Sequence, residues 1–297
     1  MTRRQLTLAY ALDLLIGDPD WFPHPVRWFG WMVRAGERWL QRDQVSGAAL
    51  TCSIVTLAWT LGRPRNATWQ VLFAWTTLAT RSLLSEASAV IRALEVNDLE
   101  LARHRLARIV GRDTRRLDES EISRAVIETL AESACDGIVA PLFWLAAGGV
   151  STAMAYKAVN TLDSMIGHWE PPYRNFGRVA ARLDDAANFI PARLTAWGIV
   201  ASARLQGLDA PGARRAWLAD GDKHASPNAG QSEAAMAGAL GVRLGGANSY
   251  DGEVHEAPLL YAEGRRPSAS DARRALSTVA IVSGLAFGIA LLLTRPR

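Results

Sequence analysis

Three long uncharged runs constrain the fold of this chain more than any other feature. They cover residues 44–62, 137–156 and 275–294. A helix of about 20 mostly apolar residues can cross the hydrocarbon core of a membrane, and each run is close to that length. Residues 66–80 form a shorter fourth candidate span, and residues 194–205 form a short fifth one. The alternative is that these runs are buried helices of a large soluble protein.

The rest of the chain shows helical patterns and no alternating strand pattern of useful length. Residues 97–110 and 119–136 carry apolar side chains at helical spacing. Residues 209–270 are rich in glycine, alanine and proline, which predicts a loop-dominated region such as a lid or a substrate platform. We therefore predict an all-α fold, a polytopic helical membrane protein with amphipathic helices and a Gly/Pro-rich loop region. A single membrane-embedded domain is expected to cover residues 1–297.

Arginine dominates the basic charge of the protein. The chain has 33 Lys and Arg against 29 Asp and Glu, and all but two of the basic residues are Arg. This composition suits anionic partners such as phosphates, carboxylates and lipid headgroups. The basic residues are spread along the chain without a stripe, so nucleic acid is not an expected partner. They also divide almost evenly between the two sides of a four-span topology, so the positive-inside rule gives no orientation.

A densely polar stretch follows the second uncharged run. Four of its side chains fall at positions i, i+3, i+4 and i+7 of a helix and so share one face: Lys157, Asn160, Thr161 and Ser164. Lipid does not tolerate such a face unpaired. We predict a functional helix end that lines a polar cavity at a membrane boundary. Lys157 is a candidate catalytic residue there, and Asn160, Asp163 and Ser164 are candidate substrate-binding residues.

Three carboxylates are spaced by four residues ahead of the same uncharged run. Glu128, Glu132 and Asp136 share one helical face, and carboxylates this close repel one another unless a cation or a shared proton relieves them. A Mg²⁺ ion held by oxygen ligands would do so. A solvated acidic face is the competing interpretation, with Arg124 as a partner of Glu128 one turn away.

A second acidic group lies further along the chain. Asp184, Asp185 and Asn188 can converge on one side of a helix, and this set suits a hard cation that bridges to phosphate. Arg182 and Arg193 flank the group and suit bidentate contacts with phosphate or carboxylate. The alternative is an Arg–Asp network that caps a helix.

A proline-rich segment near the N-terminus presents three further polar side chains. Three prolines between residues 17 and 27 fix a rigid, non-helical backbone around Asp18, His24 and Arg27. These are candidate substrate-binding groups, or solvated groups of a structural turn.

Two glycine-containing segments could cradle phosphate. Ser226 and Asn228 lie in one of them, and Gly245 and Gly246 in the other, where glycine allows close backbone approach. Neither segment matches a P-loop or a Gly-x-Gly-x-x-Gly fingerprint, so no standard nucleotide fold is indicated.

Taken together, these segments resemble the adenosylcobinamide-phosphate synthase family, the CbiB/CobD type of integral membrane protein in cobalamin biosynthesis. The matches run in order from residue 12 to residue 252, which makes them far more specific than any single motif. They are LDLLIGDP (12–19), PHPVR (23–27), ES (132–133), DG (136–137), AP (140–141), KAVNTLDSMIG (157–167), FG (176–177), ARLDD (181–185) with Asn188, PAR (191–193), SPNAG (226–230), AGALGVRLGG (237–246), Tyr250 and Gly252. His168 departs from the pattern, because an aromatic residue is expected more often at that position.

The resemblance implies an enzyme that joins the carboxylate of adenosylcobyric acid to (R)-1-amino-2-propanol phosphate, or to aminopropanol, as an amide, with ATP and Mg²⁺. An acyl phosphate would form first, and the amine would then displace phosphate. On this reading Asp184, Asp185 and Asn188 hold Mg²⁺, and Glu132 and Asp136 form a second metal or amine-binding group. Lys157, Arg182 and Arg193 would stabilise phosphoryl or carboxylate oxygens. The remaining candidates would bind or orient substrate: Asp18, His24, Arg27, Asn160, Asp163, Ser164, Ser226, Asn228, Gly245 and Gly246.

The same resemblance implies a multi-pass protein of the cell (inner) membrane. Its expected partners are the corrinoid, the amine and the lipid bilayer, and a complex with other late enzymes of the cobalamin pathway is open. Two other classes also stay open. One is a Mg²⁺-dependent membrane phospholipid or prenyl transferase, although no second aspartate-rich motif is found. The other is a non-catalytic subunit of a corrinoid complex.

Overall fold

The computed structural model describes residues 1–19, 21–63, 65–168 and 170–296. They separate into two compact units, each built from several stretches of the chain. The first unit comprises Met1–Arg81, Asp136–Asn188 and Ala286–Arg297, and the second comprises Ser82–Cys135 and Phe189–Leu285. The single domain expected over residues 1–297 stays a prediction.

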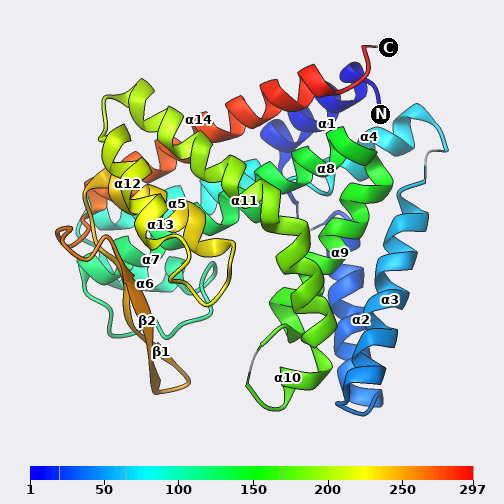
Figure 1. Ribbon diagram of the computed structural model, residues 1–297, viewed down its shortest axis with the longest axis horizontal. Helices are drawn as coiled ribbons and strands as arrows, with labels where there is room; N and C mark the ends of the chain where they lie inside the picture. Colours follow the sequence, from blue (N-terminus) through cyan, green and yellow to red (C-terminus); the bar gives the residue numbers. More distant parts are fainter. Residues whose placement is uncertain (20, 64, 169, 297) are drawn as a thin grey trace. The chain divides into compact units, whose positions relative to one another are not determined.

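The first unit is a bundle of helices. Its elements are α1 (Arg3–Ile16), α2 (Pro25–Trp39), α3 (Gln44–Leu61), α4 (Ala67–Trp75), α8 (Ala140–Gly148), α9 (Val150–Ile166), the short α10 (Tyr173–Phe176) and the start of α11 (Arg178–Gln206). Helices α2, α3 and α9 lie side by side (Figure 1). Helix α2 turns its small and apolar residues inward, with Phe29, Gly30 and Val33 buried. This face brings the N-terminal segment close to the polar helix α9.

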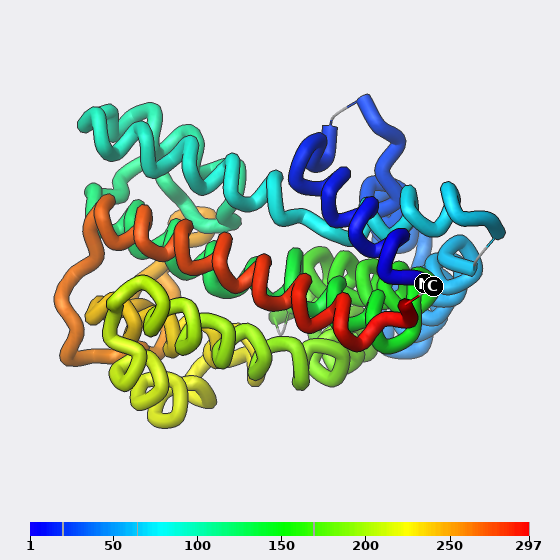
Figure 2. Tube along the Cα trace, turned by 90° about the horizontal axis from the view of Figure 1, so that it is seen from above, coloured from blue at the N-terminus to red at the C-terminus, as the bar shows by residue number. Residues whose placement is uncertain are grey.

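The two ends of the chain meet in this unit (Figure 2). The backbone N–H of Arg3 donates to the carbonyl of Arg295 at 3.0 Å, and the Arg3 guanidinium donates to the carbonyl of Thr294 at 3.0 Å. A capping box formed by Thr2 and Gln5 starts α1 directly after this contact. The two termini are therefore fixed against each other by one main-chain hydrogen bond and by a bond from the Arg3 side chain.

Close backbone packing in the first unit depends on glycine at Gly47 of α3. A methyl group at this position would overlap the backbone carbonyl of Phe176, which cannot move as a flexible side chain can. We expect Gly47→Ala to lower the free energy of unfolding by about 1–3 kcal/mol, the usual cost of overpacking. Thermal unfolding of the detergent-solubilised protein, followed by tryptophan fluorescence, measures this change. Gly288→Ala is the control, since no atom lies within 4 Å of the added methyl group. Equal melting temperatures for the two variants would refute the packing argument.

The second unit combines helices with one β-hairpin. It contains most of α5 (Thr80–Glu95), α6 (Leu99–Leu106), α7 (Glu119–Ala134), the rest of α11, α12 (Ala210–Asp220), α13 (Ala229–Leu240), the strands β1 (Leu244–Tyr250) and β2 (Glu253–Leu260), and most of α14 (Ala269–Leu293). Helices α6 and α7 fall within the predicted helices 97–110 and 119–136, and the side chains of Asp98 and Asp118 cap them.

The prediction of a loop-dominated region over residues 209–270 is wrong. Helices α12 and α13 fill its first half, and an antiparallel hairpin of β1 and β2 fills its second half, so the fold is also not purely α. Every residue of α13 is buried, which removes the amphipathic pattern that reveals a helix in a sequence. Its small residues allow α12 to approach, because a methyl group at Gly238 would overlap the carbonyl of Gly212. The strands show no clear alternation, since most of the hairpin is exposed.

Three helical stretches among the described residues are long and apolar enough to cross a membrane: Gln44–Leu61, Glu119–Gly148 and Ala269–Leu293. The first and third match the predicted runs 44–62 and 275–294. The run 137–156 is not one helix, because Gly149 adopts a φ of 79° between α8 and α9. Instead, the π-helical turn Cys135–Val139 joins α8 to α7.

The two shorter candidate spans have other structures. In the run 66–80, the helix α4 has only nine residues, too few to cross at about 1.5 Å per residue. The run 194–205 lies within α11 and is not among the three long apolar stretches of the described chain.

Candidate active site

Lys157 lies in the middle of α9 and marks the most polar part of the first unit. The structure therefore corrects the expectation that this residue sits at a helix end. Its side chain is half-buried, and burial lowers the pKa of the ammonium group, while the charges of Asp136, Asp18 and Asp184 oppose this shift. The Nζ atom lies 3.4 Å from Oδ1 of Asn160, the next residue of the predicted face. A cation at this position attracts anionic groups of a substrate more strongly than one in water.

A chain of hydrogen bonds orients the carboxylates around Lys157. Asn160 Nδ2 donates to Oδ2 of Asp136 at 3.0 Å. Asn188 Nδ2 donates to Oδ2 of Asp184 at 2.9 Å, and its own Oδ1 accepts from the Tyr156 hydroxyl at 3.0 Å. These polar side chains come from three elements: the π-helical turn, α9 and α11. We call Asp136, Tyr156, Lys157, Asn160, Asp184 and Asn188 the α9 cluster.

Asp184 is the residue of the α9 cluster whose environment best suits it to bind a cation or exchange a proton. The residue is 9% exposed, and its Oδ1 atom has no hydrogen-bond partner among the described residues. Burial first and the charge of Asp136 second raise the pKa of Asp184 to about 7, against the hydrogen bonds of Asn188 and Asn160. A carboxyl group that titrates near neutrality can hold a cation or exchange a proton.

Asp163 and Asp185 form the outer part of this acidic region. Burial and the charges of Asp184 and Asp185 raise the pKa of Asp163 to about 7. Burial also raises the pKa of Asp185, and the charge of Arg182 lowers it. Arg182 therefore acts on Asp185, and Asp185 acts on Asp163.

The metal site predicted at Asp184, Asp185 and Asn188 stays a prediction. Among the described residues, no group of three or more His, Cys, Asp or Glu side chains is arranged to hold a metal ion. Successive residues of a helix point about 100° apart, so Asp184 and Asp185 do not share one direction. The unpartnered oxygen of Asp184 nevertheless fits a hard cation, because it is buried and next to a second carboxylate.

The hydroxyl groups of the predicted polar face are already used as donors. Thr161 Oγ1 donates to the carbonyl of Lys157 at 2.7 Å, and Ser164 Oγ donates to the carbonyl of Asn160 at 2.8 Å. These are bonds one turn back along the same helix, so only the lone pairs of the two oxygens remain for a ligand.

The proline-rich segment brings Asp18 and His24 together. Oδ1 of Asp18 lies 3.3 Å from Nε2 of His24, and Nδ1 of His24 accepts from the backbone of Val26 at the start of α2. Arg27 donates to the carbonyls of Pro19 and Phe22 and so helps to hold the loop. Asp20, in the same motif, lies outside the described residues. The charge of Asp18 also acts on Lys157, which links this segment to the α9 cluster.

Sequence reasoning missed two arginines beside this region. Arg174 and Arg178 line a small cleft together with Arg182, His168 and Gly167. The three arginines are spaced by four residues along α10 and α11, a pattern that would have revealed a basic face. The walls of this cleft are therefore strongly basic.

The other predicted site residues belong to the second unit. Glu132 lies there near the buried Glu233. Burial raises the pKa of Glu233, and the charges of Glu128 and Glu132 raise it further. Arg193 lies over the Phe189 ring at 3.7 Å and donates to the carbonyl of the same residue. Roles for Glu132 and Arg193 in substrate binding or catalysis stay predictions.

The two predicted phosphate cradles lie in the second unit, and their roles in phosphate binding stay predictions. Ser226 Oγ accepts from the backbone N–H groups of Asn228 and Ala229 at 3.3 Å, in the turn that precedes α13. Gly245 and Gly246 lie in β1 with φ values of 79° and 89°, not in a turn.

Glu128 holds the hairpin in place rather than facing a metal. Its carboxylate accepts from Arg112 at 2.6 Å and from the backbone of Gly245 at 2.9 Å. It also lies 3.4 Å from Arg124, the partner that the acidic-face alternative assigned to it.

Comparison with known proteins identifies the family. The sequence profile of the CobD/CbiB protein family matches residues 6–279. The chain is 41% identical to the cobalamin biosynthesis protein CobD of Klebsiella pneumoniae, over 97% of this chain and 96% of that protein. It is 42% identical to CbiB of Salmonella typhimurium over 97% and 96% of the two chains, and 46% identical to CobD of Geobacter metallireducens over 85% and 84%. No solved structure matches this chain. The chain belongs to the CobD/CbiB family.

Proposed function

We propose that this protein forms the amide bond between the carboxylate of adenosylcobyric acid and the amino group of aminopropanol or its phosphate, using ATP. The relatives are named cobalamin biosynthesis proteins, which supports a corrinoid as the larger substrate. The observation that carries the chemistry is the α9 cluster, in which Lys157 lies among the charges of Asp136, Asp18 and Asp184. We also propose that the protein is a multi-pass protein of the cell (inner) membrane, which the three long apolar stretches support.

The reaction requires two displacements. In the first, a carboxylate oxygen of the corrinoid attacks the γ-phosphorus of ATP, the bond to the bridging oxygen breaks, and ADP leaves. In the second, the amine nitrogen attacks the acyl carbon, the bond from that carbon to the phosphate oxygen breaks, and phosphate leaves with its electron pair. An ammonium nitrogen must lose one proton before it can attack and a second as the amide forms; a basic group must accept the first, and the leaving phosphate can accept the second.

The residues of the first unit suit these requirements. Lys157 would neutralise the oxygen charge that develops on the phosphoryl or acyl group. Asp136 would bind the ammonium form of the amine. Asp163 would accept the proton, because burial raises its pKa to about 7 and a base works best near the ambient pH. Arg182, with Arg174 and Arg178, would hold anionic oxygens in the cleft beside α11.

A Mg²⁺ ion, when bound, would supply charge neutralisation at the phosphates of ATP. Asp184 is the best placed residue to hold it, because its buried Oδ1 atom has no partner within the described structure. Asp185 and Asn188 are the other two proposed ligands. Asn188 already positions Asp184 through its 2.9 Å hydrogen bond.

Ligation by the purified protein in detergent tests the proposal. Adenosylcobyric acid and aminopropanol phosphate are supplied with ATP and Mg²⁺, and mass spectrometry measures adenosylcobinamide phosphate. We expect product formation with one ADP per amide, and none when ATP is omitted. Running aminopropanol in a parallel reaction decides which amine is preferred. Product without ATP consumption, or none under any condition while the corrinoid binds, would contradict the proposal.

A further inference from the structure

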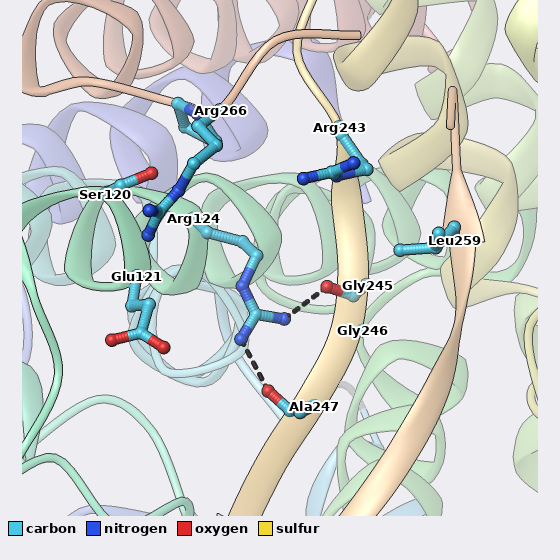
Figure 3. A pocket seen from close by; sticks show the side chains of 10 residues that line it. Ser120, Glu121, Arg124, Arg243, Gly245, Gly246, Ala247, Leu259 and Arg266 are labelled. Carbon is cyan, nitrogen blue, oxygen red and sulfur yellow. Dashed lines mark hydrogen bonds between the residues drawn. The ribbon is translucent and has the colours of Figure 1, made fainter. Parts of the chain in front are cut away.

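A pocket in the second unit gathers three arginines from different parts of the chain (Figure 3). Arg124 comes from α7, Arg243 from the residue before β1, and Arg266 from the segment between β2 and α14. All three line one pocket with a volume of about 270 Å³, and in Figure 3 the Arg124 guanidinium points onto the carbonyls of Gly245 and Ala247 in β1. The remaining lining includes Glu121, the only carboxylate among the lining residues, together with Ser120 and Gly246. The pocket therefore carries net positive charge.

Two of the three arginines are held in fixed positions. Arg124 donates to the carbonyls of Gly245 at 2.6 Å and Ala247 at 2.8 Å, which aligns it against β1. Arg266 lies 2.6 Å from the Asp118 carboxylate at the cap of α7. Such anchoring reduces the conformational entropy that a ligand must remove on binding.

Arg243 differs from these two. It is exposed, and its backbone N–H donates to the carbonyl of Arg265 at 2.9 Å, but its guanidinium group makes no hydrogen bond or ion pair within the described part of the chain. The Glu121 carboxylate does not serve it, since that group accepts from the backbone of Asp118 at 2.8 Å in the capping box. Arg124 and Arg266 have carboxylate partners in Glu128 and Asp118. Arg243 is therefore the lining guanidinium group whose charge no carboxylate of the described residues pairs, and an anion in the pocket would pair it.

We propose that this pocket binds a phosphoryl anion, either a phosphate ester or the phosphate chain of a nucleotide. Guanidinium groups match phosphate oxygens through paired hydrogen bonds, and the volume admits more than one phosphoryl group. The backbone contributes as well. Gly246 has a φ of 89°, which residues with a side chain rarely adopt, so no side chain covers the backbone on this wall of the pocket. The pocket is a site additional to the α9 cluster. Only the identity of its physiological ligand rests on the proposed function.

Hydrogen exchange of the full chain in detergent tests this inference locally. Sodium triphosphate is titrated as the probe, and mass spectrometry follows the exchange of backbone amides over residues 243–250. In the wild-type protein we expect exchange to slow with a saturable midpoint. Arg243→Gln should raise that midpoint about tenfold or more, as expected for the loss of a charge-assisted hydrogen bond. Arg214→Gln is the matched control, since Arg214 is an exposed arginine of the same unit that does not line the pocket.

Parallel titrations with ATP and with aminopropanol phosphate separate a nucleotide from a phosphate monoester as the better ligand. The absence of protection in the wild-type protein, or equal midpoints for wild type and Arg243→Gln, would overturn the inference. This readout does not require turnover. A failed ligation assay with intact triphosphate protection would count against the proposed function alone, and ligation without protection would count against the pocket alone.

Discussion

Replacing Lys157 by methionine is expected to lower the rate of amide formation by about a hundred- to a thousandfold. Methionine keeps much of the length and apolar surface of the side chain but removes the charge that lies among Asp136, Asp18 and Asp184. Loss of one preorganised group that stabilises developing oxygen charge costs a factor of this size in other enzymes. Initial rates with saturating ATP, measured by product mass spectrometry, give the effect.

Lys223→Met is the natural control, because Lys223 is the other lysine of the chain. It is half exposed and pairs with Asp220 in the second unit, so its loss should leave the rate within about twofold of wild type. A rate for Lys157→Met within tenfold of wild type, in protein that binds the corrinoid normally, would remove Lys157 from the catalytic residues.

Asp184→Asn is expected to do two opposite things: to lower ligation at least about a hundredfold and to stabilise the metal-free protein at alkaline pH. The pKa of Asp184 rises from an ordinary value of 3.8 to about 7 in the folded protein, first because of burial and then because of Asp136. The folded state therefore holds this proton more tightly than the unfolded state. Stability contributed by the proton is complete below pH 3.8 and is lost as the pH rises through 7.

Asparagine cannot ionise, so the variant avoids this loss and still accepts the hydrogen bond from Asn188. One pKa unit corresponds to about 1.4 kcal/mol, and the gain in unfolding free energy should grow to a few kcal/mol between pH 5 and pH 8. Thermal unfolding in EDTA at both pH values measures it. Asp251→Asn serves as the comparison, since Asp251 is an exposed turn residue. A variant that loses stability at pH 8, or gains equally at both pH values, would contradict the assigned pKa.

Local spacing explains which parts of the site the sequence could predict. Lys157 and Asn160 are three residues apart and Asp184 and Asn188 are four apart, and both pairs are in hydrogen-bond contact in the structure. Helical periodicity fixes such neighbours without knowledge of the fold. The hydrogen bond between Asp136 and Asn160 joins two elements, and the sequence does not predict it.

Other features depend on tertiary contacts that no local pattern encodes. Helix α13 is buried on all sides, so its sequence lacks an apolar stripe. Gly149 lies in an uncharged run that reads as one span, and only its positive φ divides that run. Arg124, Arg243 and Arg266 stand far apart in the sequence, and the hairpin is what brings them to one pocket.

The main-chain contact between the two ends of the chain limits how the protein can thread a bilayer. Arg3 and Arg295 are charged and hydrogen-bonded to each other, so in the proposed membrane-spanning protein both residues would lie in water at the same face of the membrane. A polypeptide that leaves by the face at which it entered makes an even number of complete passages. In the proposed multi-pass arrangement, the three stretches of the described chain that are long enough would therefore not be the full set of passages: either one of them stays on one side, or a further segment goes through.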